Sequence, residues 1–433
     1  MLVRLSDILY YGQPDYGTGD MKASSAAPRH ANPLGVLRLE NFRRYFVAQM
    51  ASGAGMWNQR VAELWLLLEL TGNGLSLGLG TALRTAPTLF LATAAGWLAD
   101  RYDRRLLLTG TQAARGLTGI ALAVIVFAGT PPVGLIYAII LVLGIINALD
   151  APMRRSYVRD VVDEQHLRAA AGLHTATISV GRIIGPFAAG IAITLGGVGW
   201  AFLLSVASAA VAVTAVRAIV PVERGPASTP ADATPAGDGG AGRPPREIRL
   251  VDVVVLLGAF STLGWNIDVV LPLLTDGVLG QGPLAFSGLV ICLSAGSLIG
   301  SVGVAGRTSS GRSFRSLIMP LLAFCITLPL VAVSTHVAAI AVALLLAGTC
   351  GGVFLAASNA SLQLVADRTP DRQGRAVAAY TIVFTGTRAI GAPVIGALVD
   401  QIGVRAAIVG VSGATAVTAT IAALALTYAP RST

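Results

Sequence analysis

Lysine is almost absent from this sequence, because Lys22 is the only one among 433 residues. The phosphate-binding P-loop needs a lysine followed by serine or threonine, whereas Ala23 follows Lys22. The chain therefore carries no P-loop with which to hydrolyse ATP, and primary pumping would need a partner subunit.

Histidine and cysteine are also scarce, and neither forms a recognisable site. The four histidines include no HExxH pair, and the three cysteines are isolated in apolar stretches without CxxC spacing. No clustered nucleophile and no appended soluble domain accompany them. We therefore expect no metal site, no cofactor and no enzymatic activity. The residues concerned are His30, His166, His174, His336, Cys292, Cys325 and Cys350.

Charged residues make up only 12% of the sequence, about half of the ~25% typical of soluble domains. Hydrophobic residues make up 54%, which is enough for about a dozen spans of ~20 residues each. The composition therefore predicts an all-α polytopic membrane protein. Residues 1–20 lack the apolar core of a signal peptide, and Met21 could equally be the first residue.

Apolar runs interrupted by Gly, Pro and Arg give twelve candidate membrane helices. They lie near 42–70, 75–98, 106–128, 133–152, 168–194, 198–219, 251–275, 284–305, 315–334, 336–358, 375–398 and 403–428. The stretch between the sixth and seventh, rich in Pro, Gly, Ala and Asp, is typical of a flexible linker. We therefore expect a flexible N-terminal segment 1–40, an N-terminal six-helix bundle 41–219, a linker 220–250, a C-terminal bundle 251–428 and a tail 429–433.

The arginines decide the orientation, because cytoplasmic loops of membrane proteins carry an excess of positive charge. They gather in every second loop, and only Arg405 lies on the other side. Both termini and the linker are therefore expected in the cytoplasm and the protein in the plasma membrane, and the net charge of +9 needs no nucleic-acid partner. The clustered arginines are Arg38, Arg43, Arg44, Arg101, Arg104, Arg105, Arg154, Arg155, Arg159, Arg243, Arg246, Arg249, Arg307, Arg312, Arg315, Arg368 and Arg372.

The two halves of the chain resemble each other. The set Arg182, Gly185, Gly190 and Gly197 recurs as Arg388, Gly391, Gly396 and Gly403, at a constant offset of 206 residues. Trp57-Asn58 recurs as Trp265-Asn266 at 208, and Asp160 with Arg168 as Asp367 with Arg375 at 207. Several matches at nearly one offset indicate duplication of a six-helix unit. Such parallel repeats are typical of one large class of secondary transporters.

The segment from Gly96 to Arg105, GWLADRYDRR, resembles the loop signature of the major facilitator superfamily between its second and third helices. It departs from that pattern at Asp103, where glycine is commonest. The resemblance implies twelve helices in two pseudo-symmetric six-helix bundles. It also implies a conformational gate in which the carboxylate and the arginines clamp neighbouring helix ends. The gate residues are Gly96, Asp100, Arg101, Arg104 and Arg105.

Further segments narrow the resemblance to the transmembrane secretion effector group, which contains enterobactin-exporter-like and multidrug-exporter-like carriers. The similar segments are 42–45, 49–57, 65–66 with 69–71, 100–101 with 104–105, Pro152, and 182–186 with Gly190. The second half matches more loosely, because 300–315 keeps the arginines of the corresponding loop and lacks the Asp. The group implies transmembrane efflux, by antiport, of drugs or siderophores.

The fifth predicted helix contains GRIIGPFAAG, which resembles the glycine-proline element of drug/proton antiporters. Glycines four or five residues apart let helices approach closely, and Pro186 removes a backbone donor. We add Arg182, Gly185, Pro186 and Gly190 to the gate. A plain packing seam would explain the glycines equally well. Arg182 is different, since a cation in a lipid-embedded helix costs about 2.5–3.5 kcal/mol and needs a partner or a watery cavity.

Few charges fall within the predicted helices, and they suggest a central cavity. Its predicted substrate-binding residues are Asn58, Arg60, Glu63, Arg84, Asn266 and Asp268. Arg60 and Glu63, three residues apart on one helix face, could pair with each other. Interhelical ion pairs that only fix packing are the alternative for each residue, and we assign Arg115 and Arg388 to that class.

Proton coupling needs a carboxyl group that can take up and release a proton as its exposure changes. Glu63 and Asp268 are the candidates. Arg60 would favour the ionised form of Glu63, so Asp268 is the better one. Asp268 also occupies the position that corresponds, in the repeat, to Arg60.

These observations predict a secondary active transporter that exports a small amphipathic molecule, such as a drug, siderophore or natural product, by proton antiport. A nutrient or metabolite importer or facilitator of the same fold is the alternative. The expected partners are the small-molecule substrate, protons and the lipid bilayer, and we expect a monomer. The intramembrane arginines are compatible with an anionic cargo, such as a catecholate siderophore, and equally with internal ion pairs.

Overall fold

The described part of the chain is helical. The computed structural model describes residues 33–163, 166–220, 250–305, 314–367 and 373–428, and no strand occurs among them. The predicted N-terminal segment up to residue 32, most of the linker and the tail lie outside these ranges. The first half comprises η2 (Pro33–Arg38), α1 (Glu40–Thr71), α2 (Gly74–Arg101), α3 (Arg104–Phe127), α4 (Val133–Val161), α5 (Leu167–Gly196) and α6 (Val198–Arg217).

The second half has the same succession with one interruption. It comprises α7 (Leu250–Thr262), η4 (Gly264–Asn266), α8 (Ile267–Leu273), η5 (Leu274–Val278), α9 (Pro283–Ala305), α10 (Arg315–Val333), α11 (Val337–Asp367), α12 (Gln373–Ile402) and α13 (Val404–Tyr428). Eleven of the twelve predicted ranges each coincide with one helix. The prediction of an all-α membrane fold is confirmed.

The predicted seventh helix, 251–275, is broken, and the prediction of one continuous helix there was wrong. A 3-10 turn at Gly264–Asn266 separates α7 from α8, and η5 is a π-helical turn. The Asn266 amide donates 2.9 Å bonds to the carbonyls of Ser261 and Thr262, so the side chain satisfies acceptors that the break would leave without partners. Gly264 lies against Phe324, and an added Cβ would come within 2.8 Å of that ring. Close packing at Gly264 and the side chain of Asn266 therefore stabilise the break.

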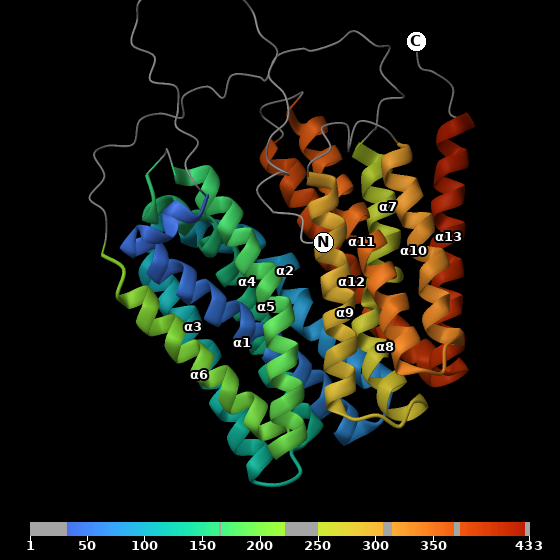
Figure 1. Ribbon diagram of the computed structural model, residues 1–433, viewed down its shortest axis with the longest axis horizontal. Coiled ribbons are helices and arrows are strands. Elements are labelled where there is room, and N and C mark those ends of the chain that lie inside the picture. Colours follow the sequence, from blue (N-terminus) through green and yellow to red (C-terminus); the bar gives the residue numbers. More distant parts are fainter. Residues whose placement is uncertain (1–32, 164–165, 221–249, 306–313, 368–372, 429–433) are drawn as a thin grey trace, which may run out of the picture. The chain divides into compact units, whose positions relative to one another are not determined.

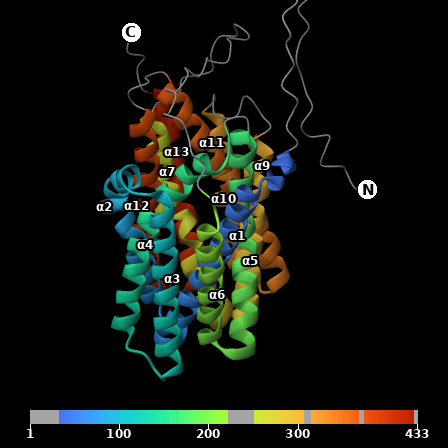
Figure 2. The same ribbon diagram turned by 90° about the vertical axis from the view of Figure 1, so that its left-hand side faces the viewer.

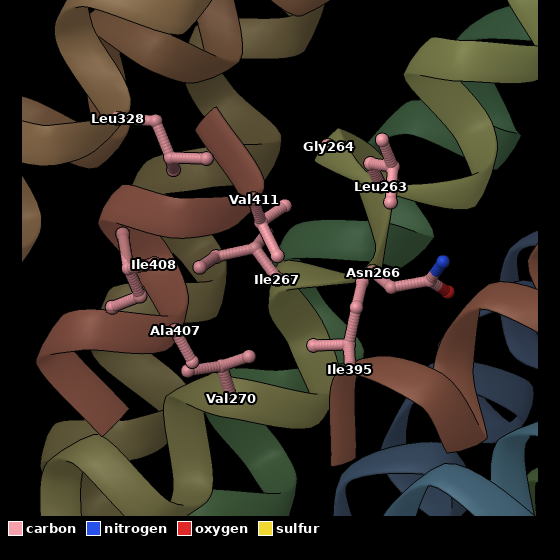
Figure 3. A pocket seen from close by; sticks show the side chains of 10 residues that line it. All are labelled: Leu263, Gly264, Asn266, Ile267, Val270, Leu328, Ile395, Ala407, Ile408 and Val411. Atoms are coloured by element: carbon pink, nitrogen blue, oxygen red, sulfur yellow. The ribbon is translucent and has the colours of Figure 1, made fainter. Parts of the chain in front are cut away.

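A small apolar cavity of about 10 Å³ lies beside the break. It is walled by Leu263 and η4 at the break and by α8, α10, α12 and α13, and the amide of Asn266 points away from Val411 and Ile408 (Figure 3). A space of this size approaches that of one water molecule, but an apolar wall offers water no polar partners. The cavity is a packing defect at the break rather than a binding site.

Ten helical stretches of the described residues are long and apolar enough to cross a membrane, and one of them, Val251–Val278, runs through the break. The long helices missing from that set are α1 and α2. They are the two that carry Arg60, Glu63 and Arg84 in their interiors. Low apolarity in α1 and α2 is thus a consequence of the charges that these helices bring into the protein interior.

The packing of the two halves follows one scheme. In the first half α1 packs against α5 and α6, α2 against α4, and α3 against α6. In the second half α7 packs against α12 and α13, α9 against α11, and α10 against α13. Figure 1 colours the first half blue to green and the second yellow to red, and Figure 2 shows α3, α5 and α6 of the first half. The contacts between halves obey the same rule, since α2 meets α12 and α5 meets α9.

Glycine makes the turns at one end of the bundles. Five turns contain a glycine with positive φ, a backbone conformation that other residues rarely adopt. We call this the glycine-turn end, and the opposite end, where α2 and α3 meet at Arg101 and Arg104, the arginine end. The five glycines are Gly72, Gly129, Gly197, Gly280 and Gly403.

The halves are packed together near the glycine-turn end. Both carboxylate oxygens of Asp400 accept hydrogen bonds from the first backbone N–H groups of α2, at 2.5 Å from Gly74 and 2.8 Å from Leu75. A Cβ on Gly396 would lie 2.1 Å from the Gly74 carbonyl. On the pseudo-symmetric side, a Cβ on Gly190 would lie 2.6 Å from the Ser287 hydroxyl. Small residues and a carboxylate at a helix N-terminus therefore close this end.

Within the second half, α9 and α11 cross at a reciprocal pair of glycine motifs. A Cβ on Gly296 or Gly300 would lie 2.1 Å from a carbonyl of α11, and one on Gly348 or Gly352 would lie 2.2 Å from a carbonyl of α9. Residues four apart on both helices thus bring the two backbones into direct contact. Such contact also permits Cα–H···O interactions between the helices.

This crossing predicts the effect of a single methyl group. Gly300→Ala should lower the free energy of unfolding by about 1–3 kcal/mol, because the helices must separate to admit the Cβ. The matched control is Gly303→Ala on the same helix, where an added Cβ meets nothing within 4 Å. Thermal unfolding of the purified protein in detergent measures both variants. Equal midpoints for the two would contradict the proposed backbone contact.

Candidate functional site

A cavity of about 210 Å³ lies where the two halves meet. Helices α1, α2 and α4 contribute to it from the first half, and α8 and α12 from the second. Three of the six predicted substrate-binding residues line it, namely Arg60, Arg84 and Asp268. The full lining is Met56, Trp57, Arg60, Arg84, Thr85, Thr88, Asn147, Asp268 and Arg388.

Asp268 joins the two halves through two guanidinium groups. Arg388 of α12 donates to both of its carboxylate oxygens, at 3.1 and 3.0 Å. Arg60 of α1 reaches it from the other half at 3.3 Å and also donates to the Thr81 hydroxyl at 2.7 Å. We call Arg60, Asp268 and Arg388 the central bridge. It places a carboxylate between two cations, one from each half.

The broken seventh helix positions the central bridge. Asp268 is the second residue of α8, directly after the 3-10 turn. Asn266, in the turn itself, accepts a 3.3 Å hydrogen bond from Arg388. A change in the direction of the chain thus presents two neighbouring acceptors to one guanidinium. Arg388, which the sequence assigned to packing, belongs to the cavity.

Glu63 pairs with Arg84, and the expected pairing with Arg60 was wrong. Arg84 of α2 donates to both oxygens of Glu63, at 2.7 and 2.5 Å. The side chain of Glu63 is only 1% exposed, against 21% for Asp268. Residues three apart on one helix share a face, but here each reaches a different partner on a neighbouring helix. Glu63 is therefore enclosed by its partner and does not line the cavity.

The two predicted asparagines also lie behind the cavity wall. Asn58 donates 2.6 Å hydrogen bonds to the Ala201 carbonyl and the Ser205 hydroxyl of α6. Asn266 is fully buried at the helix break. Both side chains satisfy neighbouring backbone or hydroxyl groups, so their contribution to the cavity is to fix the helices that form it.

A second polar cluster fills the first half beside the cavity. Asp150 lies 3.6 Å from Arg115 and pairs with Arg154 one turn along α4. Arg115 also donates to Asn147, which lines the cavity, at 2.8 Å. This agrees with the structural role expected of Arg115. Asp150 was not among the predicted residues, although a lone carboxylate at the end of an apolar run was a usable signal.

The loop between α2 and α3 is held by its arginines. Arg101 stacks over Trp97 at 5.4 Å, and Arg105 donates to the Arg217 carbonyl at the end of α6. Arg104 forms a 3.1 Å ion pair with Asp160 at the end of α4. The side chain of Asp100 lies outside the described residues. Arg104 and Arg105 thus connect the start of α3 to other helix ends of the same half.

Asp103, the departure from the family's loop pattern, caps a helix. Its carboxylate accepts a 2.8 Å hydrogen bond from the backbone N–H of Arg105, at the first turn of α3. Aspartate is among the best N-cap residues, because it satisfies an N–H that has no partner within the helix. The substitution therefore gives this loop a defined helix start. Gly96 meets nothing within 4 Å, so packing does not require glycine there.

The glycine-proline element of α5 packs against α1. A Cβ on Gly185 would lie 2.5 Å from the Ala54 carbonyl, and Pro186 is buried in the helix interior. The pseudo-symmetric Gly391 faces Thr262 of α7 in the same way, at 1.9 Å. Of the two glycines predicted for the gate in α5, Gly185 packs within its own half, whereas Gly190 touches Ser287 of the other half. The predicted packing seam is present, and it lies mostly within each half.

Arg182 stacks over the indole of Trp57, with its guanidinium carbon 4.9 Å from the ring centroid. Trp57 lines the cavity, and neither its indole nitrogen nor the Nε of Arg182 has a hydrogen-bond partner in the described structure. In the sequence, Trp57 was matched to Trp265 only as part of the repeat. Trp57 precedes the charged residues of α1 by one helical turn, which was a signal that it faces the same cavity.

Comparison with known proteins assigns the chain to a group. The family described as transmembrane secretion effector matches residues 31–431. A staphyloferrin A transporter of Staphylococcus aureus is 29% identical over 148 residues, which cover 34% of this chain and 37% of the relative. An enterobactin exporter of Shigella boydii is 24% identical over 237 residues, covering 54% and 56%. A macrolide efflux protein of Streptococcus pyogenes is 25% identical over 132 residues, covering 30% and 33%. Each of these alignments thus spans well under two thirds of the relative's own length.

Solved structures resemble the fold over nearly the whole chain. A bacterial homolog of the human lysosomal transporter Spinster superposes with a TM-score of 0.68 at 12% identity, covering 90% of this chain and 96% of that one. The nucleoside transporter NupG gives a TM-score of 0.64 at 12% identity, covering 90% and 99%. At this identity the likeness concerns the fold alone.

The enclosed Glu63–Arg84 pair predicts a large loss of stability when one partner is removed. Glu63→Met should lower the free energy of unfolding by about 3–5 kcal/mol, because it leaves the Arg84 charge buried and uncompensated. The double variant Glu63→Met with Arg84→Met should recover most of that loss. Thermal unfolding in detergent measures each.

The control for this cycle is Glu40→Met, which breaks the exposed Glu40–Arg44 pair at the start of α1 and should leave the unfolding midpoint almost unchanged. A double variant as unstable as Glu63→Met alone would show that the pair is not the cause.

Proposed function

We propose that this chain, which belongs to the transmembrane secretion effector family of the major facilitator superfamily, is a secondary active carrier that exports a small amphipathic molecule. The family consists of transporters and not of enzymes. The cargo crosses by alternating access, and the proton gradient drives the exchange. The observation that carries this proposal is the central cavity, in which charged residues from both halves meet.

The composition of the cavity supports an amphipathic cargo. Met56 and Trp57 give it an apolar side, whereas Arg60, Arg84 and Asp268 give it a charged one. Pockets that bind small molecules combine mostly apolar walls with a few polar groups that fix orientation. A molecule with an apolar body and a charged or polar group matches both sides of this cavity.

The named relatives support export as the direction. Three of them are a staphyloferrin A transporter, an enterobactin exporter and a macrolide efflux protein. Two of these names state outward movement. Their cargoes differ from one another, so the relatives support a direction of transport and a size class rather than one compound.

The contacts that close one end of the two halves support alternating access. In the described conformation the glycine-turn end is closed by Gly74, Gly396 and Asp400. We assign this end to the outside and the arginine end to the cytoplasm, since positive loops stay inside. The cargo then enters from the cytoplasm, and rocking of one half against the other exposes the cavity outward.

One part of the gate belongs to the cytoplasmic end. We assign to it Gly96, Asp100, Arg101, Arg104 and Arg105. The α5 residues Arg182, Gly185, Pro186 and Gly190 form a second part, in which Gly190 packs near the glycine-turn end. The ion pair of Arg104 with Asp160 and the bond from Arg105 to α6 stiffen the cytoplasmic end of the first half. In the outward-facing state such a stiffened edge can clamp the cytoplasmic ends of the two halves.

Proton coupling is assigned to Asp268, with Glu63 as the second candidate. Asp268 borders the cavity, is partly exposed and holds one cation of each half, whereas Glu63 is enclosed with Arg84. Protonation of Asp268 would remove the negative charge that draws Arg60 towards Arg388. Release of that bridge links proton uptake to movement of the halves.

Direction and driving force can be read in membrane vesicles. Inside-out vesicles containing the protein should accumulate enterobactin, staphyloferrin A or a macrolide when their interior is acidified. A protonophore should abolish the accumulation. Accumulation of the same compounds by right-side-out vesicles, driven inward, would establish the importer instead.

The coupling residue predicts a separation of two activities in proteoliposomes. Asp268→Asn should abolish gradient-driven flux while leaving substrate exchange, because the amide cannot take up the proton but preserves the shape of the cavity. Asp276→Asn is the matched control, since Asp276 is exposed at the glycine-turn end of the same span and should leave both activities unchanged. Unchanged driven flux in Asp268→Asn would eliminate Asp268 as the coupling site.

A further inference from the structure

The charges around the central cavity do not balance. Apart from the Arg115–Asp150–Arg154 cluster of the first half, four guanidinium groups lie at or beside it, and two carboxylates compensate them. Glu63 is fully engaged with Arg84, so Asp268 is the one carboxylate of this group left for the other three arginines, and it pairs with Arg60 and Arg388. The four guanidinium groups belong to Arg60, Arg84, Arg182 and Arg388. This region therefore carries two positive charges in excess inside the membrane.

Arg182 carries the uncompensated charge. Among the described residues no carboxylate lies within 4 Å of it, and its contact is the face of Trp57. Its pseudo-symmetric counterpart Arg388 has Asp268 as a bidentate partner. The difference has a simple origin, because the repeat position that holds Asp268 in the second half holds Arg60 in the first. The first half therefore has no carboxylate at the repeat position that supplies the partner of Arg388 in the second.

The region nevertheless holds these groups close together. Arg182 is near enough to Arg388 and Asp268 to interact electrostatically with both. The Nε of Arg182 and the indole N–H of Trp57 are buried donors without acceptors. Burying a donor without an acceptor is unfavourable, so an acceptor that reached these two groups would satisfy both. A fixed cation inside a membrane protein is ordinarily matched by a counter-charge or a watery cavity.

We propose that the cargo is an organic anion whose acid group binds between Arg182 and the Arg60–Arg388 pair, where it takes the place that the Asp268 carboxylate holds in the empty carrier. This inference rests on the proposed transport function and adds the charge of the cargo to it. Arginine presents a planar fork that suits carboxylate and related oxyanions. The apolar body of the molecule lies against Met56 and Trp57.

Asp268 then acts as a tethered competitor. While no cargo is bound, its carboxylate neutralises Arg60 and Arg388. An incoming acid group engages the same donors, so the carboxylate of Asp268 and the acid group of the cargo compete for Arg60 and Arg388. A cationic cargo would instead need Asp268 as its partner and would be repelled by the excess positive charge.

The test compares probes that differ in charge and little in shape. The probes are a panel of aromatic carboxylates, each paired with its neutral amide and with the corresponding primary amine. Binding to the purified protein is read from the emission of Trp57 in a variant whose other tryptophans are Phe, and from the thermal midpoint of the wild-type protein. Acids should change both signals, and amides and amines should not. The replaced tryptophans are Trp65, Trp97, Trp200 and Trp265.

Three variants make the test specific. Arg182→Gln should weaken binding of the acids by about tenfold or more, because one charge-assisted partner is lost, and Arg182→Lys should restore part of it. Asp268→Asn should tighten binding of the acids by a similar factor, since it removes the internal competitor. The matched control is Arg405→Gln, which removes one exposed positive charge outside the cavity and should change nothing.

The outcomes separate this inference from transport itself. Four results would each overturn it. They are equal binding of acids and amides, preferential binding of amines, no binding of any acid, and loss of acid binding in Asp268→Asn. Transport of a neutral or cationic compound without acid binding would leave the proposed function standing and refute the inference. Acid binding without transport of any compound would do the reverse.

Discussion

A guanidinium group in a membrane-embedded helix must find a counter-charge, a hydrogen-bond acceptor or water, and this constraint organises the centre of the protein. Arg60 and Arg388 meet it by sharing Asp268, and Arg84 meets it with Glu63. Each pair ties two helices together, and the Asp268 pair ties the two halves. The contact between the two halves at the centre therefore depends on the charge of one carboxylate, that of Asp268.

Duplication explains both the order and the exceptions in this arrangement. Equivalent helices pack in equivalent ways, and Gly185 and Gly391 press against α1 and α7 at corresponding positions. One difference between the repeats breaks the equivalence at the axis. The first half has Arg60 at the position where the second half has Asp268. Two identical half-sites would each hold an arginine and its own partner. The altered pair instead reaches across, and it leaves Arg182 with the face of an indole.

Hydropathy and glycine spacing were sufficient to predict the helices, and the family resemblance to predict their grouping. Eleven of twelve ranges were found because ~20 apolar residues between turn-forming residues have few other interpretations in a membrane protein. The break at Gly264–Asn266 was not, since one glycine in an apolar run looks the same whether the helix continues or bends. It is fixed by Phe324 and by the Asn266 side chain, which are tertiary contacts.

The site was predictable in its residue types and much less in its pairings. Arg60, Arg84 and Asp268 were found because intramembrane charges are rare. The partner of each was missed, because helix spacing specifies only neighbours on one helix, whereas these pairs join different helices. The sequence contains two pairs of glycines four residues apart, Gly296 with Gly300 and Gly348 with Gly352. Their reciprocal contact depends on which helices become neighbours, and the sequence does not specify this.

The break in the seventh span gives the central bridge a particular mechanical setting. Asp268 lies on α8, a helix of only seven residues between the 3-10 turn and the π-helical turn η5. This short helix contacts α1 and α2 of the first half and α9, α12 and α13 of the second. Irregular turns at both ends let a short segment shift without bending a whole helix, and π-helical turns are frequent at functional sites. A change at Asp268 is therefore transmitted first to a short element that touches both halves, while the glycine contacts of α9 with α11 keep their bundle rigid.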